Sequence, residues 1–244
     1  KINVVDANDN DPLFEAAEVN VTINENEPAG AAVIKVNARD RDSGENAYIS
    51  YSIANLNPVP FEIDHFTGSV RTTQVLDYES MRREYILRIR ASDWGVPYRR
   101  QTEMQLRIIL RDVNDNRPQF EKVDCVGNVP RLLPIGSEIM TLSAIDFDAG
   151  NIISYRTVSG NEDGCFSLDS TSGVLSVTCD LADVSVNERI VNVTATDGTH
   201  FADVTSIRMQ LVNTKRVMSN SNNGDDTGNF QCRDTGVARR LTEV

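Results

Sequence analysis

The sequence predicts an all-β protein made of two tandem seven-stranded β-sandwiches. Three observations support this fold class: apolar and polar residues alternate in short runs, turn residues separate the runs, and the whole pattern occurs twice. The 244 residues are enough for two ordinary domains, and a hydrophobic content of 40% supplies a core for each.

Four runs in the first half of the chain alternate with a period of two, which is typical of strands with one buried face. Their apolar positions are Val19, Val21 and Ile23; Ile34, Val36 and Ala38; Tyr85, Leu87, Ile89 and Ala91; and Met104, Leu106, Ile108 and Leu110. No segment shows a helical stripe. Short strands separated by Gly, Pro, Asn and Asp turns favour a β-sandwich.

The same pattern returns about 105 residues later, the length of one seven-stranded sandwich. FEIDHFTGSV at 61–70 returns as FSLDSTSGVL at 166–175. We therefore expect one repeat at 12–116 and a second at 117–215. Residues 1–11 are interpreted as a linker from a preceding repeat, because the chain begins inside a motif, and we expect a piece of a longer protein.

The charge of the chain limits its partners. A net charge of −12, from 36 acidic and 24 basic side chains, argues against nucleic acid and anionic membrane surfaces. Many of the acids are clustered, which favours cations. DANDNDP at 6–12 and DVNDNRP at 112–118 each place four oxygen-bearing side chains in one turn. Such side chains suit both loops and hard cations such as calcium.

Further acids lie where predicted strands end. Antiparallel strand directions bring seven carboxylates to the junction between the repeats: Glu25, Asp77, Glu79, Asp115, Asp146, Asp148 and Asp197. Carboxylates this close repel one another unless a cation neutralises them. Calcium takes 6–8 oxygen ligands, and three ions would bring six positive charges against the seven negative ones. The box is therefore predicted to be a linker whose residues are ligands.

The motifs INENEP, ARDRDSGEN, LDYE, ASDWGVP and DVNDNRP, in this order, resemble the calcium motifs of the cadherin superfamily. The resemblance covers roughly residues 1 to 215, and the style of the motifs is similar to the long Fat and Dachsous types. It implies Greek-key sandwiches in a linear array that bind Ca2+. It also implies the extracellular part of a single-pass plasma membrane protein, with other cadherin ectodomains as partners in cis or trans.

The resemblance assigns ligands at the junction ion by ion. The first ion takes Glu25, Asp77, Glu79 and Asp115. The second takes Glu25, Glu79, Asp115 and Asp148, with the carbonyl of Val113. The third takes Asn114, Asp146, Asp148 and Asp197, with carbonyls of Asn116 and about Asn151.

The upstream box resembles half of such a site. Its ligands would be Asn8, Asp9, Asp40, Asp42 and Asp93, with carbonyls at Asn10 and Asn46. The acids of a preceding repeat are absent, so one ion is expected there.

The second repeat departs from the pattern at its far end. At the positions where the first repeat has NENEP, LDYE and the acid box, the second repeat has NVPRLLPIG, LADV and LVNTKR. Since all three acid sources are missing together, this repeat is predicted to lack a C-terminal calcium site. Residues 216–244 are interpreted as a flexible tail or as the start of a truncated membrane-proximal module.

Cysteines and sequons fit an extracellular chain. Folding the hairpin CFSLDSTSGVLSVTC brings Cys165 and Cys179 together, so a disulfide is predicted, with two buried thiols as the alternative. Cys125 and Cys232 either pair with each other or leave Cys232 with a partner outside this chain. Asn20 and Asn192 begin N-V-T glycosylation sequons on outward strand positions.

No catalytic constellation accompanies these features. His65 and His200 lie in turn-like sequence without a nucleophile motif and are interpreted as surface histidines. The chain is thus predicted not to be an enzyme and to have no small-molecule substrate. The leading hypothesis is calcium-dependent cell–cell adhesion by a stalk segment whose linker calcium stiffens. The alternative is a partner-recognition module in which calcium sets only the angle between repeats.

Overall fold

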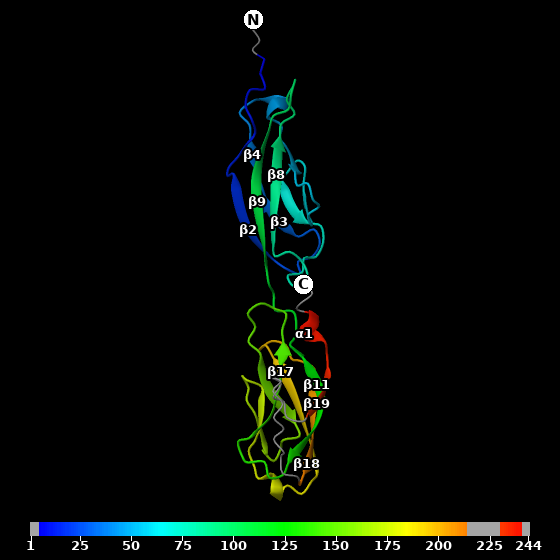
Figure 1. Ribbon diagram of the computed structural model, residues 1–244. Coiled ribbons are helices and arrows are strands. Elements are labelled where there is room, and N and C mark those ends of the chain that lie inside the picture. Colours follow the sequence, from blue (N-terminus) through cyan, green and yellow to red (C-terminus); the bar gives the residue numbers. More distant parts are fainter. Residues whose placement is uncertain (1–4, 214–229, 241–244) are drawn as a thin grey trace, which may run out of the picture. The chain divides into compact units, whose positions relative to one another are not determined.

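The computed structural model describes residues 5–213 and 230–240, and it divides the chain into two units, Lys1–Val113 and Asn114–Val244. Both units are built from strands (Figure 1). Helical structure in the described part is limited to η1 (Gly44–Ala47), η2 (Leu181–Asp183) and α1 (Val237–Arg240). None of the helices found there has the length and apolar character needed to cross a membrane. The all-β prediction is confirmed.

The first unit contains a four-stranded sheet, a three-stranded sheet and a short strand pair. The four-stranded sheet has the order β2-β9-β8-β5, and the three-stranded sheet has the order β3-β7-β6. Strands β2 and β9 run parallel, and the other pairs are antiparallel. The bounds are β1 (Leu13–Phe14), β2 (Glu18–Asn24), β3 (Ala32–Lys35), β4 (Ala38–Arg39), β5 (Ser50–Ile53), β6 (Phe61–Ile63), β7 (Ser69–Thr72), β8 (Glu84–Ser92) and β9 (Gln101–Arg111).

Alternation places the core as the sequence predicts. Every second residue is buried in β8, and in β9 from Met104 onward, and Leu87, Ile89, Leu106 and Ile108 are fully enclosed. One expected strand is split: β3 pairs with β7, whereas β4 pairs with β1. The chain changes partner between the two pieces, and alternation alone does not reveal such a change because Val36 stays buried within it.

The second unit repeats this plan. Strands β14-β17-β18-β11 follow the order of β5-β8-β9-β2, and β12-β16-β15 follow β3-β7-β6. Its bounds are β10 (Gln119–Phe120), β11 (Lys122–Pro130), β12 (Glu138–Thr141), β13 (Ala144–Ile145), β14 (Ser154–Ser159), β15 (Phe166–Leu168), β16 (Val174–Val177), β17 (Glu188–Thr196), β18 (Thr205–Val212) and β19 (Phe230–Asp234). Its core is a separate cluster that includes Leu175, Val191 and Met209.

Strand β19 is an addition that the sequence pattern does not predict. It pairs antiparallel with β11 and makes a fifth strand at the edge of the larger sheet. A disulfide joins Cys232 to Cys125, and Val237 beyond it is buried. Residues 230–240 therefore pack on the second sandwich, and do not form the flexible tail or separate module expected for 216–244. The rest of that expectation lies largely outside the described residues, since 214–229 and 241–244 are not described.

The reason for this difference is that five residues are too short for a clear strand signal. The strand is held by contacts that are distant in sequence. The ring of Phe230 lies where a Cβ on Gly127 would stand, at 2.6 Å, so the glycine admits the ring. The Thr235 hydroxyl donates to the carbonyls of Phe120 and Glu121 at 2.7 and 3.0 Å.

The two Gly turns noted in the repeated segments have the same close packing. Gly68 and Gly173 have φ of +69° and +72°. A Cβ at either would stand 2.3 Å from the carbonyl oxygen of Val36 or 2.4 Å from that of Leu142. Glycine is thus required twice over, by the backbone conformation and by space.

We expect Gly68→Ala to destabilise the first unit by about 2 to 5 kcal/mol, since the left-handed backbone and the clash both add a cost. Gly30→Ala is the matched control, because Gly30 has φ of +86° but nothing within 4 Å of its Cβ position. It should cost only about 1 to 2 kcal/mol. Urea unfolding followed by the fluorescence of Trp94, the one tryptophan, reports on this unit alone. Equal costs for the two substitutions would contradict the packing argument.

Candidate metal centres

The two acidic boxes fold in the same way in the two units. In the first, the backbone N–H of Asn10 donates to Asp42 Oδ2 at 3.1 Å, and its side-chain amide donates to Asp42 Oδ1. In the second, the N–H of Asn116 donates to Asp148 Oδ2 at 3.1 Å, and its amide donates to Asp148 Oδ1 at 2.7 Å. Each box is therefore bound to the acidic loop that follows the β4 or β13 strand.

The fourth residue of each box is tied to the fifth. The Asn10 amide donates to Asp9 Oδ1 at 2.8 Å, and the Asn116 amide donates to Asp115 Oδ1 at 2.9 Å. Asp9 and Asp115 are both exposed. The two boxes thus place an exposed aspartate at the same position, held by the asparagine that follows it.

The acid that opens each loop has one oxygen fixed and one turned inward. Asp40 Oδ1 accepts the N–H of Asp42 at 2.9 Å, and Asp146 Oδ1 accepts the N–H of Asp148 at 3.0 Å. The other oxygens, Asp40 Oδ2 and Asp146 Oδ2, are buried and have no hydrogen-bond partner within the described part of the chain. A buried, unsatisfied carboxylate oxygen is costly, so a partner for it is expected.

Burial also changes how these acids titrate. It raises the pKa of Asp40 above its ordinary value, and repulsion from Asp42 and Asp93 adds to the effect. The pKa of Asp146 is raised for the same reasons, first by burial and then by the neighbouring carboxylates of Asp148 and Asp197. The ionised form of both acids is therefore disfavoured until a positive charge approaches.

The acid after the long β8 or β17 strand completes each group. Asp93 is fully buried; its Oδ1 accepts the N–H groups of Gly95 and Arg100 at 3.1 and 2.9 Å, while its Oδ2 has no partner among residues that the structure describes. Asp197 Oδ1 likewise accepts two N–H groups, those of Thr199 and His200, each at 2.6 Å. Burial opposes ionisation of Asp197, but these donors lower its pKa overall.

His200 is a residue whose role the sequence analysis missed. Its Nδ1 lies 2.9 Å from Asn114 Oδ1 and 3.3 Å from Asp197 Oδ2. It therefore contacts two predicted ligands and is not an isolated surface histidine. Its position three residues after a predicted ligand, in the same turn, was the available signal.

The amides predicted beside the acids are close to them as well. Asn8 Oδ1 is buried without a hydrogen-bond partner in the described chain, while Asn8 Nδ2 donates to the Tyr98 carbonyl at 2.9 Å. Gly95 leaves room for the Asn8 amide, since a Cβ on Gly95 would stand 2.0 Å from Asn8 Nδ2 and 2.9 Å from Asn46 Oδ1. In the second unit, the Asn151 amide donates to Asp148 Oδ2 at 3.3 Å.

A second acidic group lies at the opposite end of the first unit. Carboxylate oxygens of Glu25, Glu79 and Asp112 lie within 4.8 Å of one another. Glu25 is 2% exposed and accepts the N–H of Tyr78 at 2.6 Å and that of Val113 at 2.8 Å. It thereby connects the LDYE turn to Val113, the second residue after β9.

Asp112 was not among the predicted ligands, although it is the first residue of the acid box. The structure places it beside Glu25 and Glu79. Asp77, which was predicted, has both oxygens engaged: Oδ2 accepts the Ser80 hydroxyl at 2.7 Å, and Oδ1 accepts the N–H groups of Glu79 and Ser80. The Ser80 hydroxyl is the main reason why the pKa of Asp77 is lowered.

The corresponding end of the second unit contains an arginine. Arg131 occupies the position of Glu25 in register, since the N–H of Arg131 donates to the Val212 carbonyl just as the N–H of Glu25 donates to the Arg111 carbonyl. The Arg131 guanidinium donates to the carbonyls of Leu181, Val184 and Val186. The sequence shows that acids are absent here, and the structure shows that a cation of the chain itself binds the loop.

The donor set fits a hard divalent cation. The groups consist of carboxylate and amide oxygens, and all four cysteines are in disulfides. Calcium favours such ligands, whereas zinc favours thiolate and imidazole. Buried oxygens without partners, in acids whose pKa is raised by burial, are what a bound cation would satisfy. The chain's residues therefore fit calcium.

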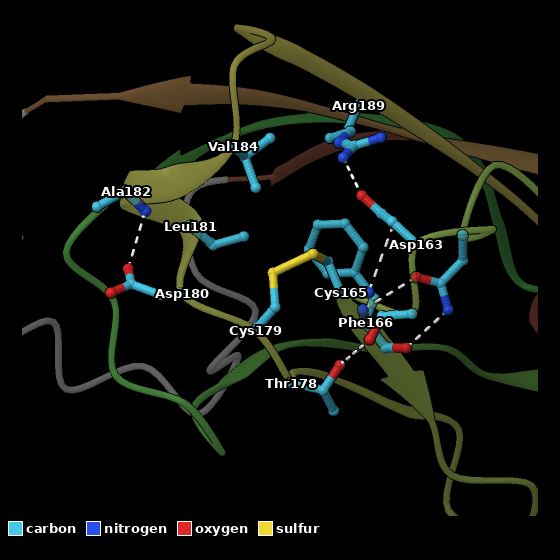
Figure 2. The surroundings of a disulfide bond; sticks show 12 residues. Asp163, Cys165, Phe166, Thr178, Cys179, Asp180, Leu181, Ala182, Val184 and Arg189 are labelled. Carbon is cyan, nitrogen blue, oxygen red and sulfur yellow. Dashed lines mark hydrogen bonds and ion pairs between the residues drawn. A yellow bond between two sulfur atoms is a disulfide. The ribbon is translucent and has the colours of Figure 1, made fainter.

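The second disulfide closes the hairpin described in the sequence. Cys165 and Cys179 are joined, next to β15 and β16 (Figure 2). Thr178 Oγ1 donates to the Gly164 carbonyl at 2.6 Å, and Asp163 pairs with Arg189 of β17 beside the bond. The bond thus lies where this hairpin meets the larger sheet.

The two glycosylation sequons differ in environment. Asn20 is exposed on β2. Asn192 is half-buried on β17; its amide nitrogen donates to Ser159 Oγ at 2.9 Å and its Oδ1 accepts the Ser206 hydroxyl at 2.7 Å. The atom that a glycan would modify is therefore engaged at Asn192.

Comparison with known proteins gives one consistent family. Residues 19–111 match the cadherin domain. The Fat-like cadherin-related tumor suppressor homolog of Drosophila melanogaster is 59% identical over 249 residues, and human Protocadherin Fat 1 is 45% identical over 245 residues. The first alignment includes 100% of this chain and the second 99%. The chain spans only 5% of the length of each relative. The solved structure of mouse Cadherin-23 EC22-24 has a TM-score of 0.75 at 30% identity, covering 85% of this chain and 66% of that one.

We expect Arg131→Ala to destabilise the second unit by about 1 to 3 kcal/mol, because several loop carbonyls lose their donor. The loss should be the same in calcium and in chelator. Arg208→Ala is the matched control: Arg208 is an arginine on the exposed face of β18, bonded to Glu188, and should stay within about 0.5 kcal/mol. Hydrogen exchange of the β17 and β18 amides measures both. A calcium-dependent loss in the Arg131 variant would show that its loop belongs to a metal site.

Proposed function

The chain belongs to the cadherin superfamily, and from this premise we propose that it is a calcium-stiffened stretch of a cell-surface adhesion protein. The family is one of adhesion ectodomains rather than enzymes. The observation that carries the proposal is the set of buried carboxylate oxygens without partners on Asp40, Asp93 and Asp146. The Oδ1 atom of each acid accepts a backbone N–H, which orients the carboxylate, and a cation would satisfy the buried Oδ2 atom.

The acids at the end of the first unit and those at the start of the second would supply ligands to shared calcium ions. The first-unit contribution is Glu25, Asp77, Glu79 and Val113, to which Asp112 is now added. The second-unit contribution is Asn114, Asp115, Asn116, Asp146, Asp148, Asn151 and Asp197. Calcium would supply positive charge and 6–8 coordination positions for oxygen. In its absence the carboxylates assigned to these ions would repel one another, and the linker would loosen.

The upstream group would hold one ion by itself. Its ligands come from Asn8, Asp9, Asn10, Asp40, Asp42, Asn46 and Asp93. The second unit would end the calcium-linked series, because Arg131 fills the place of Glu25 and binds the loop directly.

In this function the chain acts as a spacer of fixed shape. Stiff linkers would hold successive repeats at fixed angles, so that a distant adhesive face reaches other cadherin ectodomains in cis or trans. The place of action would be the extracellular side of the plasma membrane, in a single-pass, membrane-anchored parent. A glycan is proposed on Asn20, and less readily on Asn192, whose amide is hydrogen-bonded.

A second candidate function, partner recognition by the first unit, rests on an exposed aromatic cluster. Tyr48, Phe66 and Trp94 are 51%, 58% and 36% exposed. The Tyr48 ring lies 5.8 Å from that of Trp94 and 6.3 Å from that of Phe66. Exposed aromatic rings that contact one another are frequent at binding surfaces. Saturable binding of this chain to another cadherin ectodomain, lost in Tyr48→Ala but kept in chelator, would favour recognition over the stalk function.

The test of the proposed function is the response of the linker to calcium. Spin labels on either side of residues 112–116 should report a narrow distance distribution in calcium and a broad one in chelator. Calorimetry should give dissociation constants on the order of 10⁻⁴ to 10⁻³ M, the range of extracellular modules. A linker that does not respond, or sites of micromolar affinity, would contradict the proposal.

Ligand substitutions give a ranking. Glu25→Ala and Asp115→Ala should weaken calcium binding more than Asp77→Ala, because the first two are assigned to two ions each and Asp77 is already engaged by Ser80. Glu25→Ala should in addition destabilise the first unit in chelator, since the N–H groups of Tyr78 and Val113 lose their acceptor. Glu62→Ala, on the exposed face of β6, is the control and should change neither property. Equal damage from Asp77→Ala would refute the assignment.

A further inference from the structure

The disulfide between Cys125 and Cys232 encloses nearly the whole second sandwich. The two cysteines are 107 residues apart in sequence. Cys125 lies near the beginning of β11, and Cys232 lies within β19, the last strand described. Strands β12 to β18 all fall between them. The loop closed by this bond therefore contains the main hydrophobic core of the unit.

The strand pairing around the bond places both flanking chain segments on one side of it. Because β11 and β19 are antiparallel, Val123 pairs with Arg233 on the side toward the chain ends. Val126 pairs with Gln231 and Gly127 with Phe230 on the side toward the enclosed loop. Tension applied to the two flanking segments would thus first separate the residue pairs outside the disulfide, such as Val123 and Arg233. The disulfide itself would then carry the load.

We propose that this disulfide is a mechanical bypass, which carries tension past the second sandwich. The covalent path runs from the linker to Cys125, across the sulfur atoms to Cys232, and onward. Residues 126–231 lie off this path and bear no tension through the main chain. The second sandwich would then retain its enclosed fold at forces that unfold an unprotected neighbour.

The contacts outside the bond set how much chain is released first. They include the ion pair between Arg233 and Asp124 at 2.7 Å, the Thr235 hydroxyl bonds to Phe120 and Glu121, and buried Val237. Phe120 also belongs to the core. Peeling of these short segments is therefore expected to precede loading of the disulfide, but it frees few residues on each side.

The first sandwich provides an internal reference. All four cysteines lie between residues 125 and 232, so the first unit contains no such bond. Its strands β1 to β9 lie in series on the covalent path. Under the same load the main chain of the first unit can unfold and extend along its whole length. In the second unit the disulfide prevents extension of residues 126–231. This difference between the units follows from the covalent connectivity of the chain and is independent of calcium binding.

The experiment is single-molecule stretching of the full chain between handles at residues 1 and 244, without reductant. One domain-sized extension step is expected, from the first unit, together with a short release from the outer segments. Chelator should lower the force of the first-unit step if the proposed function is correct, but the number of domain-sized steps should stay at one. The two proposals can therefore fail separately.

Two double variants identify the bond responsible. Cys125→Ala with Cys232→Ala should add a second extension. The sequence separation of 14 between Cys165 and Cys179 stays closed, so 93 of the 107 residue-to-residue steps between Cys125 and Cys232 become free. At 3.3–3.6 Å for each step they add roughly 310 to 335 Å. Cys165→Ala with Cys179→Ala should add nothing, because that bond lies inside the enclosed loop.

Adding reductant to the wild-type chain under constant force covers the case in which the first double variant fails to fold. Reduction of both bonds should then release roughly 350 to 385 Å for the sequence separation of 107 between Cys125 and Cys232. Two domain-sized steps in the unreduced wild-type chain would overturn the proposal. So would an unchanged extension after reduction or after removal of Cys125 and Cys232.

Discussion

The interaction on which the site depends is the hydrogen bond from a backbone N–H to one oxygen of an acidic side chain. Such bonds fix Asp40, Asp93, Asp146 and Asp197 by one oxygen each. The turn geometry thus holds the carboxylates together despite their mutual repulsion, and the second oxygen is presented toward its neighbours. Burial and like charge disfavour ionisation of Asp40 and Asp146, and this is the electrostatic condition that a divalent cation relieves.

The same sandwich is closed in two different ways at its far end. In the first unit a buried carboxylate, Glu25, accepts N–H groups from the LDYE turn and from Val113. In the second unit Arg131 donates to carbonyls of the corresponding loop. Reversing the charge at one position also reverses which backbone groups are bound, so the loop carbonyls receive hydrogen bonds from a side chain of the same unit. The second unit combines this closure with strand β19 and the Cys125–Cys232 bond.

Strand β19 also changes the exposure of the sheet edge. In the first unit β2 is the edge strand of the four-stranded sheet, whereas in the second unit the equivalent β11 is covered by β19. An unpaired edge strand is a place where another chain can add, and covering it removes that possibility. The edge on β2 instead carries the exposed sequon residue Asn20. The two repeats therefore differ in what they offer to a partner, although their cores follow one plan.

Local pattern was sufficient for most of the fold and for most of the candidate ligands. Alternation in β8 and β9 specifies which residues are buried, because side chains of a strand point to opposite faces in turn, and repetition of the motifs specifies two units. Acidic residues next to strand ends mark the candidate ligand positions for the same local reason. The sequence by itself thus determined the sandwich fold, the repeat and the acid-rich boxes.

Only the tertiary structure decided the contacts between residues distant in sequence. It added Asp112 to the Glu25 group, brought His200 to Asn114, set Arg131 in the place of Glu25, and paired Cys125 with Cys232. Each depends on the register between strands or on a partner about a hundred residues away, for which one-dimensional periodicity holds no information. The physical reason is that alternation reports the face on which a side chain lies, whereas the neighbour across the sheet is set by how the whole chain packs.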